Sequence, residues 1–287
     1  MNQIDLHVHS TRSDGTFTPT QLVDYAAEKG LAAFALTDHD SIDGLEEAIS
    51  YAGKRRLQYP DTPQVIPGIE FSTEYQGRDI HIVGLDIDYH SDEFNSRLRD
   101  FISARTERNI KMCTLLQEGA HMDISYDKLL AEFPASTITR AHYAAYMLKH
   151  GYIKGINEAF ERYVGDHCPY YVPRHKVTPL QAIELILQAS GIPILAHPML
   201  YHFSKDRLER LVSELAAGGL LGIEAIYPTH TAGEEREIRA LANKYSLAIM
   251  LGGRKTVKLK NGENQWFSRG GVTEVTPFPV SSVLPEG

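Results

Sequence analysis

Two histidines near the start of the chain have the spacing of a shared metal site. His7 and His9 stand two residues apart in the segment QIDLHVH, whose alternating pattern is typical of a strand. Side chains two residues apart on a strand point to the same face, so both imidazoles can reach one ion. A pair with this spacing is weak evidence by itself, and its meaning depends on what the other strands contribute.

Asp14 follows in the loop after this strand, and later predicted strands add an imidazole or a carboxylate at or near their ends. In chain order these later residues are His39, Glu70, His81 and His197. Because the set contains no thiolate and exceeds what one tetrahedral ion can use, we expect two or three divalent ions such as Mn, Fe or Zn. Such a cluster lowers the pKa of a bound water and holds the oxygens of a phosphoryl group, which makes phosphate-ester hydrolysis the leading chemistry.

The elements that must position these residues alternate along the chain. Strands are predicted at 3–9, 32–37, 64–71, 79–88, 192–196, 221–227 and 247–251, and helices at 19–29, 42–58, 178–190, 205–217 and 232–245. Thr18-Pro19 and Thr178-Pro179 are typical helix starts, because Thr caps the first turn and proline fits the first helical position. The alternation indicates a mostly parallel α/β sheet, and the number of units favours a closed or nearly closed barrel over a doubly wound sheet.

The strand pattern is interrupted between about 92 and 172. Helices are predicted there at about 92–119, 126–132, 139–150 and 155–164. We therefore divide the chain into three parts. They are a barrel (1–91 and 173–253), a helical insertion that caps the substrate (92–172), and an atypical tail (254–287) with weak periodicity and scattered Gly and Pro.

Composition excludes several other classes of protein. The 287 residues are 43% hydrophobic and 23% charged, which argues against wholesale disorder and allows a sizeable core. The net charge of −8 argues against a broad nucleic-acid or membrane surface but leaves room for a small basic pocket that binds a phosphate. With two distant cysteines, no signal peptide and no apolar run of membrane-spanning length, we expect a cytoplasmic protein without an obligate protein partner.

Several segments resemble the motifs of the PHP (polymerase and histidinol phosphatase) family of metal-dependent phosphoesterases. They are DLHVHSTRSDGTFTPTQLVDYAAEKGLAAFALTDHDSIDGLEEA, PGIEFSTEYQGRDIHIVG, ITRAHYAAYML, AFERYVGDHCPYYVPRHKV, GIPILAHPM and LGIEAIYPTHT. The resemblance implies a distorted (β/α)7 barrel with a helical insertion. It also implies hydrolysis of phosphate monoesters on small nucleotides, such as nucleoside 3′,5′-bisphosphates, or on short oligonucleotides, including short RNA.

The resemblance also assigns roles to the candidate ligands. It implies that His7, His9 and Glu70 hold one ion, Asp14 and His39 a second, and Glu70, His81 and His197 a third. Glu70 would bridge two ions, because each of its carboxylate oxygens can take one. Asp38 is implied to act in catalysis by orienting a ligand imidazole. From the residues alone, capping of the following helix is an equally good interpretation of Asp38.

The predicted insertion and the loops around it supply cationic side chains for a substrate. The candidates for substrate binding are Arg140, His142, Arg174, Lys176 and His230. A guanidinium matches the oxygens of a phosphate, so Arg140 above a metal cluster would act in catalysis by selecting a substrate with a second phosphate. A solvated helix face for the basic residues, and helix packing for His142, remain open alternatives.

The end of the barrel departs from the family pattern. The family's last strand ends in G-G-S-D-x-H-G, whose Asp and His complete two metal sites, whereas Lys255 and Val257 stand at those positions here. A lysine ammonium would repel the ions. Three interpretations follow: the tail is not the native end of the barrel, the protein keeps a reduced metal set, or it is a catalytically impaired relative that binds metal or nucleotide. An amidohydrolase on a similar barrel is a further alternative, which the TDHD and ITRxH motifs disfavour.

Overall fold

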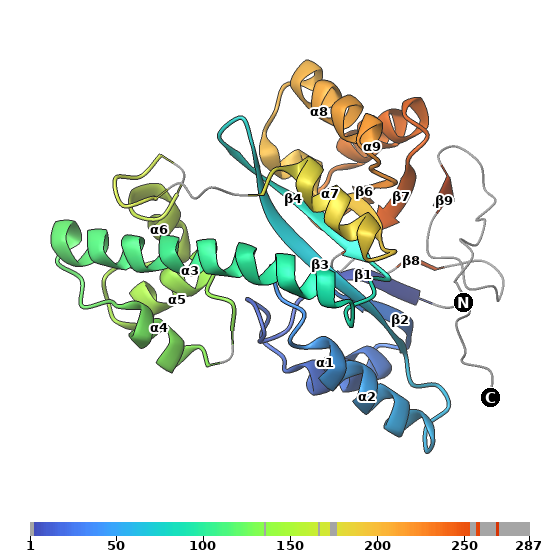
Figure 1. Cartoon of the computed structure of the whole chain (residues 1–287), viewed down its shortest axis with the longest axis horizontal. Coiled ribbons are helices and arrows are strands. Elements are labelled where there is room, and N and C mark those ends of the chain that lie inside the picture. Colours follow the sequence, from blue (N-terminus) through green and yellow to red (C-terminus); the bar gives the residue numbers. More distant parts are fainter. Residues whose placement is uncertain are drawn as a thin grey trace.

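In the computed structural model, strands and helices alternate outside one long helical segment (Figure 1). The structure describes residues 3–134, 136–165, 167–172 and 177–252, and the backbone of 257–258 and 268–269. The strands are β1 (Gln3–Val8), β2 (Leu31–Leu36), β3 (Gln64–Tyr75), β4 (Arg78–Leu85), β5 (Ile192–Leu195), β6 (Gly222–Ile226), β7 (Ala248–Leu251), β8 (Val257–Lys258) and β9 (Ser268–Arg269). The helices are α1 (Pro19–Glu28), α2 (Leu45–Arg56), α3 (Asp92–Ala120), α4 (Tyr126–Glu132), α5 (Arg140–Lys149), α6 (Ile156–Arg162), α7 (Pro179–Gln188), the 3-10 helix η1 (Pro198–Tyr201), α8 (Lys205–Ala217) and α9 (Ala232–Lys244).

The described strands form one sheet in the order β8-β1-β2-β3-β4-β5-β6-β7-β9. Neighbouring strands from β1 to β3 are parallel, as are those from β5 to β7, whereas β4 is antiparallel to both β3 and β5. The reversal follows from a two-residue turn, Gln76-Gly77, in which both residues have positive φ, the conformation of a tight hairpin. The mostly parallel sheet is thus confirmed for the seven central strands, of which β4 runs in the opposite direction. The two-residue strands β8 and β9 are antiparallel to β1 and β7.

The predicted helix starts are confirmed where the sequence signal was strongest. Thr18 and Thr178 each accept a hydrogen bond from the backbone of the third residue of the following helix, and the Gln side chain at that position bonds back to the Thr backbone. Each pair forms a capping box, with Pro19 or Pro179 in the first turn. These caps fix where α1 and α7 leave the sheet, and therefore where the preceding loops lie.

The sheet curls so that its first and last central strands approach each other. A Cβ on Gly252, which follows β7, would lie 2.5 Å from the Cβ of His7 in β1, so only glycine fits at this approach. Helices α1 and α2 lie at one edge of the curled sheet and α8 and α9 at the other (Figure 1). The predicted α/β fold, a distorted barrel of seven central strands with a helical insertion, is confirmed.

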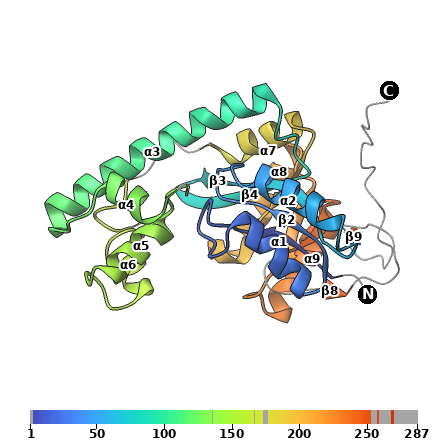
Figure 2. The ribbon, with the colours of Figure 1, turned by 90° about the horizontal axis from the view of Figure 1, so that it is seen from below.

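The insertion, helices α3 to α6, projects from the barrel and packs around a hydrophobic cluster of its own (Figure 2). Leu116, Tyr143 and Met147 are buried in that cluster. Helix α3 joins the two parts, because Phe94 and Leu98 near its start belong to the barrel core. None of the helices in the described ranges is long and apolar enough to cross a membrane.

Candidate metal centre

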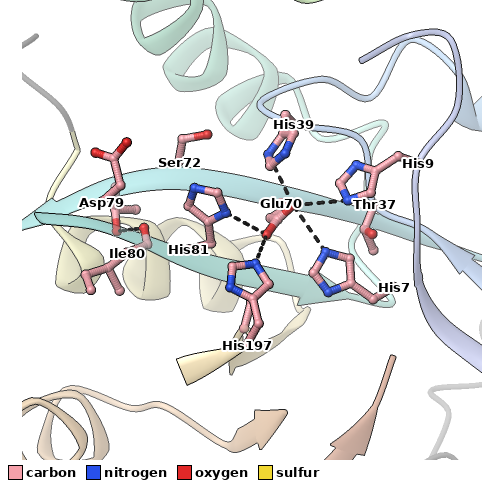
Figure 3. Close-up of polar contacts among 12 residues, drawn as sticks. His7, His9, Thr37, His39, Glu70, Ser72, Asp79, Ile80, His81 and His197 are labelled. Atoms are coloured by element: carbon pink, nitrogen blue, oxygen red, sulfur yellow. Dashed lines mark hydrogen bonds and ion pairs between the residues drawn. The ribbon is translucent and has the colours of Figure 1, made fainter. Parts of the chain in front are cut away.

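Five imidazoles converge on the carboxylate of Glu70, which is 1% exposed in the middle of β3 (Figure 3). Oε2 of Glu70 lies 3.2 Å from Nε2 of His7, 3.2 Å from Nε2 of His9 and 3.1 Å from Nδ1 of His39, and Oε1 lies 2.8 Å from Nδ1 of His81 and 3.0 Å from Nε2 of His197. Each carboxylate oxygen therefore faces its own group of ring nitrogens. This arrangement suits a carboxylate that bridges two cations.

The barrel strands bring these side chains together from distant parts of the chain. His7 lies in β1 and His9 directly after it, and an isolated parallel bridge joins His39 to Glu70. His197 follows β5, while His81 lies inside β4, opposite Ser72 of β3. His81 therefore does not reach the centre from the carboxyl end of a parallel strand, as the other candidate histidines do. It reaches the centre because the β3–β4 hairpin extends beyond the point where β2 ends.

Asp14 completes the set of predicted ligands from the loop between β1 and α1. Its carboxylate oxygens lie 3.6 Å from Nδ1 of His9 and 3.5 Å from Nε2 of His39. The structure thus brings together all seven residues that the sequence proposes as ligands. Their assignment to particular ions stays a prediction.

The donor set fits divalent metal ions. The donor atoms form two groups of three, and the atoms within each group lie within 4.8 Å of one another. One group belongs to His7, Glu70 and His197, and the other to His9, His39 and Glu70. Within the described residues, Oε2 of Glu70 and Nδ1 of His39 are buried but make no hydrogen bond, although they lie 3.1 Å apart. Buried polar atoms normally have partners, so such a pair is expected where a cation belongs. Neutral imidazoles with few carboxylates and no thiolate suit Zn, Mn or Fe.

Burial and neighbouring charges act in opposite directions on the ionisable groups of the centre. Burial raises the pKa of Glu70, but the imidazoles of His39 and His7 oppose burial and hold that pKa well below its usual value. Burial lowers the pKa of His39 to about 3 and lowers the pKa of His197. An ionised carboxylate therefore faces neutral imidazoles at these two positions. Burial also lowers the pKa of His7 and His9, but nearby carboxylates, Glu70 above all, outweigh burial and raise both pKa values, that of His7 well above its usual value.

Asp38 holds the loop that carries His9 and Asp14. Its carboxylate accepts hydrogen bonds from the backbone of Ser10 (2.8 Å), from the Ser10 hydroxyl (2.7 Å) and from the Ser13 hydroxyl (2.6 Å). The Ser13 oxygen also lies 3.3 Å from Nδ1 of His9, so Asp38 reaches a candidate ligand through Ser13. The alternative prediction, a helix cap, is wrong, because α2 begins at Leu45 with Gly44 as its N-cap.

Sequence reasoning missed Glu224, which lies in β6 and is fully buried. Its oxygens lie 3.2 and 3.3 Å from Nδ1 of His7, and the backbone N–H of His197 donates to it at 2.7 Å. A signal was present, because an acidic residue inside the apolar strand GIEAI is costly to bury without a partner.

A cavity of about 200 Å³ separates the metal centre from the insertion. Asp14, His39 and His81 line it on the barrel side, and Arg105, Arg108 and Arg140 line it on the insertion side, with Phe160 at its wall. Sequence reasoning found Arg140 but missed the two arginines of α3, although their spacing of three places them on one helix face.

Two of the three arginines, Arg140 and Arg105, are held in place by polar partners. Arg140, the first residue of α5, forms an ion pair with Asp79 of β4, and its guanidinium lies 5.5 Å from the ring centre of Tyr171. Arg105 lies 3.2 Å from a carboxylate oxygen of Asp40 and donates to the Ser72 hydroxyl at 3.0 Å. Guanidinium groups therefore border the cavity from two helices, α3 and α5.

The two histidines predicted to bind substrate, His142 and His230, are not among the residues that line the cavity. Nδ1 of His142 accepts a hydrogen bond from the backbone of Thr139 at 3.0 Å, and its ring packs on Phe133, which is the geometry of the helix-packing alternative. His230 is buried and donates from Nδ1 to the carbonyl of Ala225 at 3.1 Å.

Two predicted substrate-binding residues, Arg174 and Lys176, lie outside the described residues. Lys255, which stands where the family pattern has Asp, lies outside them as well. For Val257 the structure describes only the backbone, which pairs with Ile4 at the amino end of β1.

The fold and the site define a barrel hydrolase with a buried, histidine-rich metal centre. Comparison with known proteins gives the family, because residues 5–156 match the PHP domain. The chain is 34% identical over 250 residues to a "5'-3' exoribonuclease" of Haemophilus influenzae, covering 86% of this chain and 88% of that protein. It is 32% identical over 249 residues to a "3',5'-nucleoside bisphosphate phosphatase" of Chromobacterium violaceum, covering 86% and 85%.

A solved structure agrees with these sequence matches. It is described as an amidohydrolase from Chromobacterium violaceum with bound sulfate and no metal, and it superposes with a TM-score of 0.80 at 30% identity, covering 90% of this chain and 92% of that one. The chain therefore belongs to the PHP domain family. The predicted class of enzyme, a metal-dependent phosphoesterase, is confirmed at the level of this family.

Proposed function

We propose that the protein hydrolyses phosphate monoesters of small nucleotides, such as nucleoside 3′,5′-bisphosphates, or of short oligonucleotides. The observation that carries this proposal is the cavity with candidate metal ligands on one wall and three arginines on the other. A substrate with two phosphates has one group for each wall. Two or three ions of Mn, Fe or Zn, when bound, would activate a water and neutralise the oxygens of the reacting phosphate.

The residues of the two walls have separate tasks in this proposal. The imidazoles and Glu70 fix the reacting phosphate at the barrel end. Arg105, Arg108 and Arg140 receive the second phosphate, since a guanidinium pairs with phosphate oxygens through two parallel hydrogen bonds. Phe160 at the wall offers an apolar surface for a base. We include the helical insertion (92–172) in this role as the substrate cap of the barrel (1–91 and 173–253).

The relatives support this class of substrate. The names of the Haemophilus and Chromobacterium proteins refer to RNA and to a nucleoside bisphosphate, and both proteins align over most of their length with this chain. A short RNA held by its terminal phosphate would use the same two walls. A cytoplasmic location stays a prediction that rests on the use of two cysteines.

The predicted alternative is a catalytically impaired relative that binds metal or nucleotide. It rests on Lys255 and Val257, which replace an expected Asp and His. It requires metal or nucleotide binding without turnover, whereas the main proposal requires turnover.

Release of inorganic phosphate from adenosine 3′,5′-bisphosphate in the presence of Mn²⁺ tests the proposal. We expect turnover that a chelator abolishes, and a kcat/KM above that for p-nitrophenyl phosphate. An anilide, in which hydrolysis breaks an amide bond, serves as the comparison substrate for amidohydrolase chemistry. Binding of the bisphosphate without phosphate release would favour the impaired alternative, and cleavage of the amide alone would contradict the phosphoesterase.

A further inference from the structure

A buried carboxylate lies behind the metal centre and outside its cavity. Glu224 is 0% exposed and sits in a strand whose other residues are apolar. Burying an ionised carboxylate is costly unless it is hydrogen-bonded, so its partners indicate why it is there. Both partners belong to candidate metal ligands, the ring of His7 and the backbone of His197.

The contact with His7 determines which ring nitrogen carries the proton. Nδ1 lies 3.2 and 3.3 Å from the two oxygens of Glu224, while Nε2 faces Oε2 of Glu70 at 3.2 Å. A carboxylate only accepts hydrogen bonds, so Nδ1 is the donor toward Glu224. When an ion occupies the centre, Nε2 is then the ring nitrogen of His7 that is left to bind it (Figure 3).

The contact with His197 stabilises an unusual backbone. His197 has φ 25° and ψ 57°, outside the favourable regions for a residue with a Cβ. Its N–H donates to Oε2 of Glu224 at 2.7 Å, and its ring places Nε2 3.0 Å from Oε1 of Glu70. Strained backbone persists where surrounding contacts fix it, and the Glu224 carboxylate provides one such contact.

Gly252, after β7, has no side chain and so leaves space for the carboxylate of Glu224. A Cβ on Gly252 would lie 2.1 Å from Oε1 of Glu224 and 2.5 Å from the Cβ of His7. Any larger residue at this position would displace the pair. The end of β7 is therefore shaped around the contact between Glu224 and His7.

We infer that Glu224 is a positioning residue for the metal centre: it fixes the ring of His7 through Nδ1 and the backbone of His197 through the N–H. The inference rests on the metal centre of the proposed function. His7 and His197 form, with Glu70, one of the two groups of closely spaced donor atoms. Outer partners of this kind orient a ligand imidazole and make it more basic, and their loss weakens metal binding by roughly 10- to 100-fold.

Two measurements on the full-length chain test this role. The first is ¹⁵N NMR of the histidine rings in the Zn²⁺-loaded wild-type protein, which reports the protonated nitrogen without any substitution. The second is Zn²⁺ affinity by competition with a chelating dye, for Glu224→Gln and for the matched control Glu214→Gln. Glu214 is a carboxylate of α8 that bonds to the hydroxyl of Tyr75, remote from the centre.

The expected result is a His7 ring with a proton on Nδ1 and Zn²⁺ on Nε2 in the wild type. Glu224→Gln should lower the affinity for one Zn²⁺ by about 10- to 100-fold, and Glu214→Gln should leave it unchanged. Zn²⁺ on Nδ1 of His7, or equal affinity in Glu224→Gln and the wild type, would overturn the inference about Glu224. Absence of Zn²⁺ binding by the wild type would overturn the metal centre itself, which is a distinguishable failure.

Discussion

The barrel end and the helical insertion place opposite chemistry on the two walls of one cavity. On the barrel side, imidazoles surround a buried carboxylate, and these side chains together come from five central strands or the loops directly after them. On the insertion side, arginines project from α3 and α5, which pack around a separate hydrophobic cluster. The difference suggests a division of tasks. The sheet fixes the group that reacts, and a unit with its own core selects the substrate, so each can be altered separately.

The largest expected effect is on the barrel side, from Glu70→Gln. The amide offers one weak acceptor where five imidazoles now face a charged carboxylate. We expect loss of bound metal and a fall in kcat of at least roughly 10³-fold, more than the loss of an outer partner causes. Metal analysis with phosphate-release kinetics checks this. A variant with normal metal content and normal kcat would remove Glu70 from the centre.

A single histidine ligand should have a smaller effect, confined to one ion. His81→Ala and His197→Ala each remove a ring that faces Oε1 of Glu70 at 2.8 or 3.0 Å. We expect each variant to bind one ion fewer, or to bind it roughly 100-fold more weakly. Metal stoichiometry after dialysis measures this, and equal stoichiometry in the wild type and both variants would contradict the assignment.

Arg140→Ala tests the insertion side. The guanidinium borders the cavity, and only a bisphosphate offers it a second phosphate. Loss of a charge-assisted, partly desolvated contact should cost about 2 kcal/mol, or about 30-fold in KM for adenosine 3′,5′-bisphosphate. The KM for p-nitrophenyl phosphate should change little. Equal effects on both substrates would give Arg140 a structural role through its ion pair with Asp79.

The smallest effect is expected two positions further along the same helix. His142→Ala removes the side chain that accepts from the backbone of Thr139 at the start of α5. Loss of such a cap should lower the free energy of unfolding by about 1 kcal/mol, with metal content unchanged and the selectivity between the two substrates retained. Thermal unfolding and the ratio of the two kcat/KM values measure this. A selective rise in KM for the bisphosphate would show that His142 contacts substrate.

Local sequence signals predicted the elements well and the strand directions less well. The helices at 126–132 and 205–217 begin after Ser125 and Ser204, whose hydroxyls accept from the third backbone N–H, and both helices have the predicted bounds. Alternation of side chains does not encode the direction of a strand, so the reversal of β4 was not predicted. The turn Gln76-Gly77 contained the only local cue.

The same limit applies to the site. The candidate ligands were predictable because the same residue types recur along successive predicted strands and several occur in motifs that resemble those of the family. Glu224 contacts a residue 217 positions away, and Arg105 and Arg108 line the cavity because α3 extends from the barrel core into the insertion. Such roles depend on tertiary contacts, which no local pattern records.

The central claim is that the two walls bind two different phosphates. Crystals grown with Mn²⁺ and a non-hydrolysable phosphonate analogue of a nucleoside 3′,5′-bisphosphate, measured at the manganese absorption edge, test it most directly. The account predicts anomalous peaks between Glu70 and its imidazoles, the phosphonate beside them, and the other phosphate within hydrogen-bond distance of Arg105, Arg108 or Arg140. Manganese elsewhere, or a nucleotide with both phosphates away from these arginines, would contradict it.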